Sequence, residues 1–286
     1  MKYPTSTLII SVYKDTEALN LILECVDQQT VKPTEVIISE DGDNPDMASF
    51  ILHAKVKFPN LNVIHLTQED VGWRKNRALN RAVVAAKSNY LIFIDGDCLP
   101  YSTFIENHLL LSQENTILAG RRIEFNESLS HEIRRKTIHF HDLTNHYFRN
   151  LPTLLKFKTR HLEEMFYINA KNPLSKLLRR KVNFLLGCNW SCYKNDLLKI
   201  NGFDENFIAP TYGEDTDVAM RLKGIGIEVK SCRYSANLVH LYHKKNFNQE
   251  QAHTNYLIHN KSADNKQYVC LNGIKKITVK KFPHSS

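Results

Sequence analysis

The sequence predicts an α/β fold in which a mostly parallel sheet is flanked by helices and a helical, basic segment is inserted. Between residues 7 and 94, short apolar β-branched runs alternate with amphipathic stretches. The runs are apolar at nearly every position, which is typical of parallel strands whose two faces are both covered by helices. Residues 131–181 interrupt this alternation with a helix-prone, aromatic and basic stretch, so we expect an insertion there.

The strands and helices can be assigned in order along the chain. A strand is expected at residues 7–13, and Asp15 can then cap a helix whose apolar positions run from Ala18 to Val26. The alternation continues with a strand at 35–39, a helix at 46–56, a strand at 62–66, a helix at 74–86 and a strand at 90–94. After the insertion we expect a strand at 190–193, a helix at 194–200 and a helix that ends at Lys223.

Composition and charge narrow the class of protein. The chain has 286 residues, of which 42% are hydrophobic and 24% are charged. These values exclude a disordered, collagen-like or coiled-coil protein and suffice for one large domain with a substantial core. The net charge of +8 is concentrated in two segments: residues 131–181 hold twelve basic and four acidic residues, and residues 261–286 hold six basic and one acidic residue.

The sequence gives no sign of a membrane span or of a secreted protein. No apolar run approaches the roughly 18 residues needed to cross a bilayer, and the run at residues 8–13 is too short for a signal peptide. The six cysteines form no paired metal-binding pattern, so we expect reduced thiols in the core. We therefore expect a cytoplasmic protein.

Polar side chains follow three of the expected strands, at residues 13–15, 40–42 and 95–97. Ligands bind at the carboxyl ends of parallel strands in sheets of this kind. Asp95 and Asp97 follow the strand at 90–94 directly, and Mg²⁺ or Mn²⁺ takes oxygen ligands of this type. An ordinary Asp-Gly turn would have the same sequence, so this motif alone does not define a metal site.

A second group of carboxylates lies at residues 213–217, before the helix that ends at Lys223. Asp and Thr are residues that cap helices, and capping explains Asp217. Glu214 and Asp215 exceed what a cap requires. One of them is therefore a candidate for a general base.

Three further motifs have both a functional and a purely structural explanation. His240 and His243 are candidates to complete a metal site with Asp97, although most histidines are not ligands. Trp190 is a candidate platform for a sugar ring, or a core residue of an alternating strand. The cations of residues 74–77, among them Arg74 and Lys75, either bind a diphosphate at the start of their helix or form a solvated helix face.

Taken in order, these motifs resemble a family 2 glycosyltransferase of the Rossmann-like GT-A fold, with a carboxyl half similar to family 7 galactosyltransferases. The segments that carry the resemblance are residues 9–14, 36–42, 69–75 with 79–80, 90–100, 187–191, 201–205, 213–217 and 240–243. Together they span about residues 7–121 and 182–245. The resemblance implies a single catalytic domain over residues 1–260, with a nucleotide-binding half (1–121), the insertion (about 131–181), an acceptor or catalytic half (182–260) and a basic tail (261–286).

The resemblance also implies roles for the site residues. Donor nucleotide and sugar binding would involve Ser11 and Tyr13 packing against uracil, Asp41 hydrogen bonding to it, and Asp95 near the ribose and sugar. The metal, Mn²⁺ or Mg²⁺, would be bound by Asp97, His243 and His240, while Asp215 would be the base and Glu214 would hold substrate hydroxyls. The commoner Ala-Arg-Asn motif of the family reads Ala78-Leu79-Asn80 here, so the arginine role passes to Arg74 or Arg77.

These observations predict an inverting, metal-dependent glycosyltransferase that uses a nucleotide sugar, with UDP as the expected nucleotide. The acceptor would be a saccharide or glycolipid in surface polysaccharide or lipooligosaccharide biosynthesis. One alternative is a sugar-phosphate nucleotidyltransferase, although residues 13–15 lack its glycine-rich phosphate loop. Another is a catalytically silent saccharide-binding module on the same fold.

The basic segments suggest a further partner. Residues 177–181, 275–276 and 280–282 combine cations with apolar side chains and could contact anionic lipid at the inner face of the membrane, or form a solvated basic surface. No nucleic-acid-binding motif accompanies the charge, so we expect no nucleic-acid partner.

Overall fold

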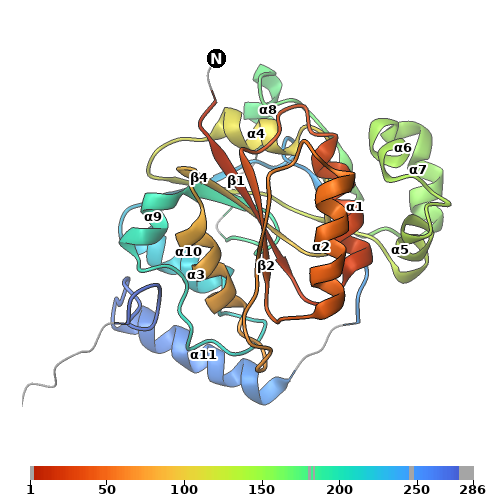
Figure 1. Cartoon of the computed structure of the whole chain (residues 1–286). Coiled ribbons are helices and arrows are strands. Elements are labelled where there is room, and N and C mark those ends of the chain that lie inside the picture. Colours follow the sequence, from red (N-terminus) through yellow and green to blue (C-terminus); the bar gives the residue numbers. More distant parts are fainter. Residues whose placement is uncertain (1–2, 180–181, 183, 245–247, 277–286) are drawn as a thin grey trace, which may run out of the picture.

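A seven-stranded, mostly parallel sheet forms the centre of the protein (Figure 1). The computed structural model describes residues 3–179, 182, 184–244 and 248–276. The strand order is β3-β2-β1-β4-β8-β6-β9, in which β8 runs antiparallel to both of its neighbours and the other pairs are parallel. The strands are β1 (Ser6–Val12), β2 (Glu35–Glu40), β3 (Val63–Leu66), β4 (Tyr90–Asp95), β6 (Thr116–Ala119), β8 (Trp190–Tyr193) and β9 (Glu228–Ser231).

Helices cover both faces of this sheet. One face carries α1 (Thr16–Asp27) and α2 (Pro45–Lys57), and the other carries α3 (Lys75–Ala85), α9 (Lys194–Lys199) and α10 (Asp215–Gly224) (Figure 1). Alternate residues of β1 enter the two cores: Leu8 and Ile10 pack with α1 and α2, while Ile9 packs with α3. Because both faces are buried, the middle positions of β1, β2 and β4 are apolar on both sides of the sheet, and the predicted α/β fold is confirmed.

A second, three-stranded sheet lies at the carboxyl edge of the first and has the order β5-β10-β7. Its strands are β5 (Cys98–Pro100), β7 (Ile123–Glu124) and β10 (Leu238–His240). In β10, His240 stands opposite Cys98 of antiparallel β5 and opposite Glu124 of parallel β7. This small sheet therefore brings β10 and the residues that follow it next to residues 95–97.

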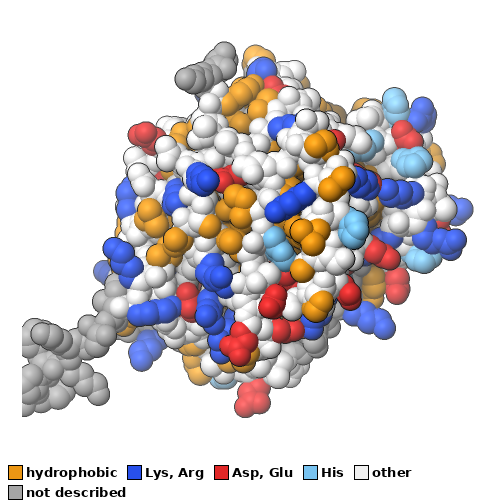
Figure 2. Space-filling view, viewed as in Figure 1, with side chains coloured by type: hydrophobic (Ala, Val, Ile, Leu, Met, Phe, Trp, Pro, Cys, Tyr) orange, Lys and Arg blue, Asp and Glu red, His pale blue; other side chains and the backbone are white. Residues whose placement is uncertain are grey.

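The predicted insertion is helical and packs onto the domain. It contains α5 (Glu127–Arg134), α6 (Phe140–Asn145), α7 (Tyr147–Lys156), the 3₁₀ helix η1 (Leu162–Met165) and α8 (Pro173–Leu178). Leu129, Phe140 and Leu154 belong to the main core, so the insertion is anchored to it by apolar contacts. Figure 2 shows that Lys, Arg and His side chains gather over α5 to α7, at the right of the view.

The remaining helices are α4 (Phe104–Leu111) and α11 (Gln249–Asp264). The chain after α11 returns to the loop that follows α9, where the Asn201 amide donates hydrogen bonds to the carbonyls of Cys270 and Lys275. All six cysteines are free and buried, as the sequence predicts. Within the described ranges, no helix is long and apolar enough to span a membrane.

Candidate active site

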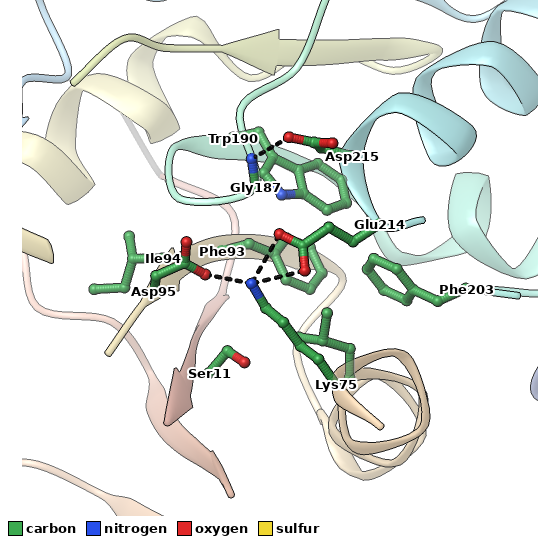
Figure 3. Close-up of a pocket in the computed structure, with 11 residues that line it drawn as sticks. Ser11, Lys75, Phe93, Ile94, Asp95, Gly187, Trp190, Phe203, Glu214 and Asp215 are labelled. Carbon is green, nitrogen blue, oxygen red and sulfur yellow. Dashed lines mark hydrogen bonds and ion pairs between the residues drawn. The ribbon is translucent and has the colours of Figure 1, made fainter. Parts of the chain in front are cut away.

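An ion-paired cluster joins the two halves of the protein at the carboxyl edge of the main sheet (Figure 3). The Lys75 ammonium, at the start of α3, lies 2.6 Å from Asp95 Oδ1 at the end of β4 and 2.8 Å from each carboxylate oxygen of Glu214. These side chains are only 16%, 24% and 17% exposed. Three segments that lie far apart in the sequence thus meet at one cation.

Burial and charge oppose each other in this cluster. Burial raises the pKa of Glu214 to about 7, although Lys75 acts in the other direction. Burial acts to lower the pKa of Lys75, but the charges of Asp95 and Glu214 outweigh it and hold that pKa well above its usual value. The pKa of Asp95 is likewise affected by burial, and the ion pair with Lys75 lowers it overall. Lys75 is therefore charged, and it stabilises both carboxylates.

Asp215 lines the same pocket and is bound differently. It is the first residue of α10, and its carboxylate accepts hydrogen bonds from the backbone N–H groups of Gly187 (2.9 Å) and Thr216 (2.6 Å). No cation pairs with it within the part of the chain that the structure describes. Asp215 is thus held in position by backbone groups, and its charge is not neutralised by a side chain.

The structure corrects the expected helix cap in this region. No side chain caps α10, and Asp217 does not cap it. Instead, Asp217 is buried and forms an ion pair of 2.6 Å with Arg221, one turn further along the helix. The Arg221 guanidinium also donates to the carbonyls of Ile200 and Gly202, which attaches α10 to the loop after α9.

A second group of potential ligands lies just before β5 and at the end of β10. Asp97 Oδ2 lies 3.3 Å from His243 Nε2 and 3.4 Å from His240 Nε2. One carboxylate and two imidazoles that converge in this way suit Mn²⁺ or a similar divalent ion. Cys98 Sγ is adjacent, and burial holds the pKa of this thiol well above its usual value. Burial lowers the pKa of His240, which favours the neutral imidazole that binds metals.

The residues that the sequence predicts for the nucleotide also lie together. Ser11 in β1 stands opposite Asp95 in the parallel register, and it lines the pocket with Lys75. Asp41 is buried and accepts hydrogen bonds from Gln68 Nε2 (2.7 Å) and from the backbone N–H of Arg74 (2.8 Å).

Tyr13, Arg74 and Trp190 differ in how far they reach solvent. Tyr13 is 53% exposed, and its hydroxyl lies 3.4 Å from Asp70. The Arg74 guanidinium has no ion pair within the described part of the chain, and its side chain is half-buried. Trp190 is 2% exposed and stacks on Phe93 with ring centroids 4.1 Å apart, and both rings are among the residues that line the pocket (Figure 3).

Two asparagines in α3 have a structural role that the sequence analysis missed. Asn76 Nδ2 donates to the carbonyls of Asp204 and Gly213, both at 2.7 Å, and Asn80 exchanges two hydrogen bonds of 2.8 Å with the backbone of Phe203. Both asparagines are buried. The available signal in the sequence was their spacing of four residues, which places both asparagines on the buried and otherwise apolar face of α3. They attach the loop that leads to Glu214 and Asp215 to α3, in the amino-terminal half of the chain.

The fold and these residues define a glycosyltransferase of the GT-A type. The chain belongs to Glycosyl transferase family 2, whose match extends over residues 7–182. A second match, to the N-terminal domain of galactosyltransferase, covers residues 175–244 and confirms the predicted similarity of the carboxyl half.

Relatives and solved structures agree with this assignment. The chondroitin synthase of Pasteurella multocida is 24% identical over 153 residues, which make up 52% of this chain and 14% of that synthase. The fold is similar to a mannosyltransferase of Pyrobaculum calidifontis in complex with GDP-Man and Mn²⁺ (TM-score 0.60, 14% identity, 93% of this chain and 65% of that chain). It is also similar to GalNAc-T7 with UDP, GalNAc and Mn²⁺ (TM-score 0.63, 12% identity, 91% of this chain and 48% of that chain).

Proposed function

We propose that this glycosyltransferase is inverting and metal-dependent, and that it moves a sugar from a UDP-sugar donor to a saccharide or glycolipid acceptor in surface polysaccharide or lipooligosaccharide biosynthesis. Two observations carry the proposal: Asp97, His240 and His243 converge on one another, and Asp215 lines a pocket that Asp95, two residues before Asp97, also lines. Glycosyl transfer from a nucleotide sugar requires a site for the leaving diphosphate and a base for the attacking hydroxyl. This arrangement offers both.

Asp97, His240 and His243 would hold the Mn²⁺ or Mg²⁺ ion. When bound, such an ion supplies electrostatic stabilisation of a leaving diphosphate. Donor binding would further use Ser11, Tyr13 and Asp41 for the base, with Arg74 or Arg77 near the diphosphate. The UDP and Mn²⁺ in the GalNAc-T7 structure support this choice of ligands, and the name of the chondroitin synthase supports a polysaccharide product.

Asp215 is the proposed base. Asp95 and Glu214 are both paired with Lys75, whereas Asp215 has no cation partner among the described residues and faces the pocket. Among the described residues that line the pocket, Asp215 is the carboxylate without a cation partner, so we expect it to deprotonate the acceptor in a single displacement with inversion. Glu214, held by Lys75, would position substrate hydroxyls.

Calorimetric titration of UDP with and without Mn²⁺ tests the proposed donor site. We expect metal-dependent binding in the native protein and in Glu114→Ala, a control at an exposed acidic residue with no side-chain partner in the described structure. Asp97→Ala should lose the metal-dependent part. Equal UDP affinity with and without Mn²⁺, or metal-dependent UDP binding that persists in Asp97→Ala, would contradict the metal assignment.

Contact with the inner face of the membrane is part of the same proposal. In α8, Leu174 and Leu177 are 50% and 79% exposed beside the exposed Lys176, and apolar side chains flanked by cations favour anionic lipid. Residues 180–181 and 280–282, which the sequence adds to this basic surface, lie outside the described residues. Sedimentation with phosphatidylglycerol vesicles should be stronger than with phosphatidylcholine vesicles, and Leu177→Asp should reduce it.

A further inference from the structure

Four arginines form a wall beside the active site that the proposed chemistry does not use. This arginine wall consists of Arg121, Arg122, Arg160 and Arg233. Two carboxylates balance it in part: Glu124 is shared by Arg122 at 2.9 Å and Arg160 at 3.2 Å, and Glu164 is held by Arg233 at 2.8 Å.

One more acidic residue lies at the rim of the wall. Glu163 is 60% exposed, interacts with Arg233 at longer range and lies 3.9 Å from His161. Asp95 also interacts with Arg122 at longer range, but Asp95 is already paired with Lys75. Among the described residues, the member of the wall that no carboxylate pairs with is therefore Arg121.

Arg121 is the arginine that lacks a carboxylate partner. Its guanidinium stacks on the ring of Phe184, 4.0 Å from the ring centroid, and it makes no ion pair within the described parts of the chain. Burial lowers the pKa of Arg121, and nearby Arg233 lowers it further, whereas Glu164 acts to raise it. A partly buried cation without a partner is costly, and an incoming anion would stabilise it.

The wall lies next to both parts of the proposed active site. The Asn189 amide donates to the Arg121 carbonyl at 2.7 Å, and Asn189 is two residues from Gly187, whose N–H binds Asp215. On the other side, Glu124, which holds Arg122, stands beside the proposed metal ligand His240 in the small sheet. Arg121 thus contacts, through Phe184 and Asn189, the two sides of the segment whose Gly187 N–H holds Asp215.

We propose that Arg121, together with the arginine wall, binds a carboxylate or phosphate group carried by the acceptor saccharide. This inference rests on the proposed transferase function and narrows its acceptor to an anionic one. A guanidinium that stacks on an aromatic ring keeps its N–H edge free, and this edge matches the two oxygens of a carboxylate or phosphate.

An anionic saccharide fits this site better than an anionic membrane does. The side chains of Arg122 and Arg233 are 28% and 16% exposed, whereas Arg160 is 71% exposed. A bilayer requires apolar and basic side chains that project together from one surface. A single negatively charged group on a flexible sugar chain can reach side chains that are mostly covered.

Binding of matched charged and neutral sugars to the protein loaded with UDP and Mn²⁺ tests the inference. The probes are a hyaluronan tetrasaccharide and its carboxyl-reduced form, and, for phosphate, glucose 6-phosphate and glucose. We expect one of the charged probes to bind more tightly than its neutral partner. In Arg121→Gln its affinity should fall by about 10- to 100-fold, with a smaller loss in Arg121→Lys.

The matched control is Arg149→Gln, because Arg149 is an exposed arginine of α7 with no side-chain partner in the described structure. It should bind the probes as the native protein does. Equal affinity for charged and neutral probes in the native protein, or unchanged affinity in Arg121→Gln, would overturn the inference. In either case, intact metal-dependent UDP binding would leave the proposed function standing, whereas loss of UDP binding in the native protein would contradict the function itself.

Discussion

The proposed nucleotide-binding half and the proposed acceptor half of this protein position their candidate site residues by different means. In the first half, Ser11, Asp41 and Asp95 come at or directly after the ends of parallel strands β1, β2 and β4. In the second, Glu214 and Asp215 lie between a long irregular loop and α10. The main sheet therefore positions the side chains of the first half. Those of the second half depend on contacts from α3: Lys75 contacts Glu214, and Asn76 and Asn80 bind the loop before it.

From this comparison we expect nucleotide binding and sugar transfer to be separable by mutation. Changes in the acceptor half should affect transfer and leave nucleotide binding intact, and changes in the α3 contacts should affect the relation between the halves. The following predictions test this separation, beginning with the largest expected effect.

Asp215→Asn should lower the transfer rate by about 10²- to 10⁴-fold, the usual contribution of a general base. UDP binding with Mn²⁺ should be unchanged, because Asp215 contacts Gly187 and Thr216 and none of the proposed nucleotide ligands. Initial rates of sugar transfer and UDP calorimetry on the same preparation measure both effects. A native transfer rate would show that Asp215 is not the base.

Asn76→Ala should weaken the contact between α3 and the loop before Glu214. It removes two buried hydrogen bonds to the carbonyls of Asp204 and Gly213, which should lower the free energy of unfolding by about 2–3 kcal/mol. Because the loop before Glu214 loses its tether, transfer should fall more than UDP affinity. Urea denaturation and steady-state kinetics measure the two effects.

The control for this variant is Asn195→Ala, at an exposed position of α9 with no side-chain partner in the described structure. It should change the free energy of unfolding by less than about 0.5 kcal/mol. If UDP affinity and transfer fall together in Asn76→Ala, the halves are not separable through α3.

Gly187→Ala should disturb the acceptor half alone. A Cβ atom at this position would lie 2.1 Å from Glu214 Oε1, so the Glu214 side chain must move away from Lys75. We expect about a tenfold loss of transfer from misplacement of the site, with UDP affinity unchanged. The same tenfold loss in UDP affinity would place Gly187 in the donor site instead.

The last prediction concerns the pH dependence of stability and not the transfer rate, and it depends on the burial of Glu214 beside Lys75. The pKa of Glu214 is raised from 4.5 to about 7 in the folded protein, so between these values the folded state binds more protons than the unfolded state. The contribution of Glu214 to stability therefore decreases as the pH rises from about 4.5 to about 7. Glu214→Gln should remove this decrease, as thermal denaturation at a series of pH values would show. An unchanged pH profile in the variant would contradict the raised pKa.

The regular part of the fold could be predicted because its signals are local. Strands β1 to β4 and helices α1 to α3 match the expected residue ranges within a few positions, since hydrophobic periodicity and Asp15 as a cap act over a few residues. Strands β5, β7 and β10 were not predicted. They are two or three residues long and pair across more than a hundred residues of chain, so no local pattern marks them.

The candidate site shows the same division. The sequence by itself determined which residue types follow each strand: Asp41 after β2, Asp95 and Asp97 at β4 and β5, and the pair Glu214 and Asp215 at α10. Only the tertiary structure decided which of these carboxylates are neutralised. Lys75, expected either beside a diphosphate or on a solvated helix face, pairs with Asp95 and Glu214, and Asp215 has no cation partner among the described residues.

Arg121 illustrates the physical reason. Its sequence neighbours give it no distinctive pattern. That it has no carboxylate partner among the described residues depends on where β7, η1 and the loop after β9 place Glu124, Glu164 and Arg233. Hydrophobic periodicity is a property of a single segment, so a sequence can specify it alone. Ion pairs, burial and the pKa shifts that follow from them depend on the distances between segments, and those distances exist only once the chain has folded.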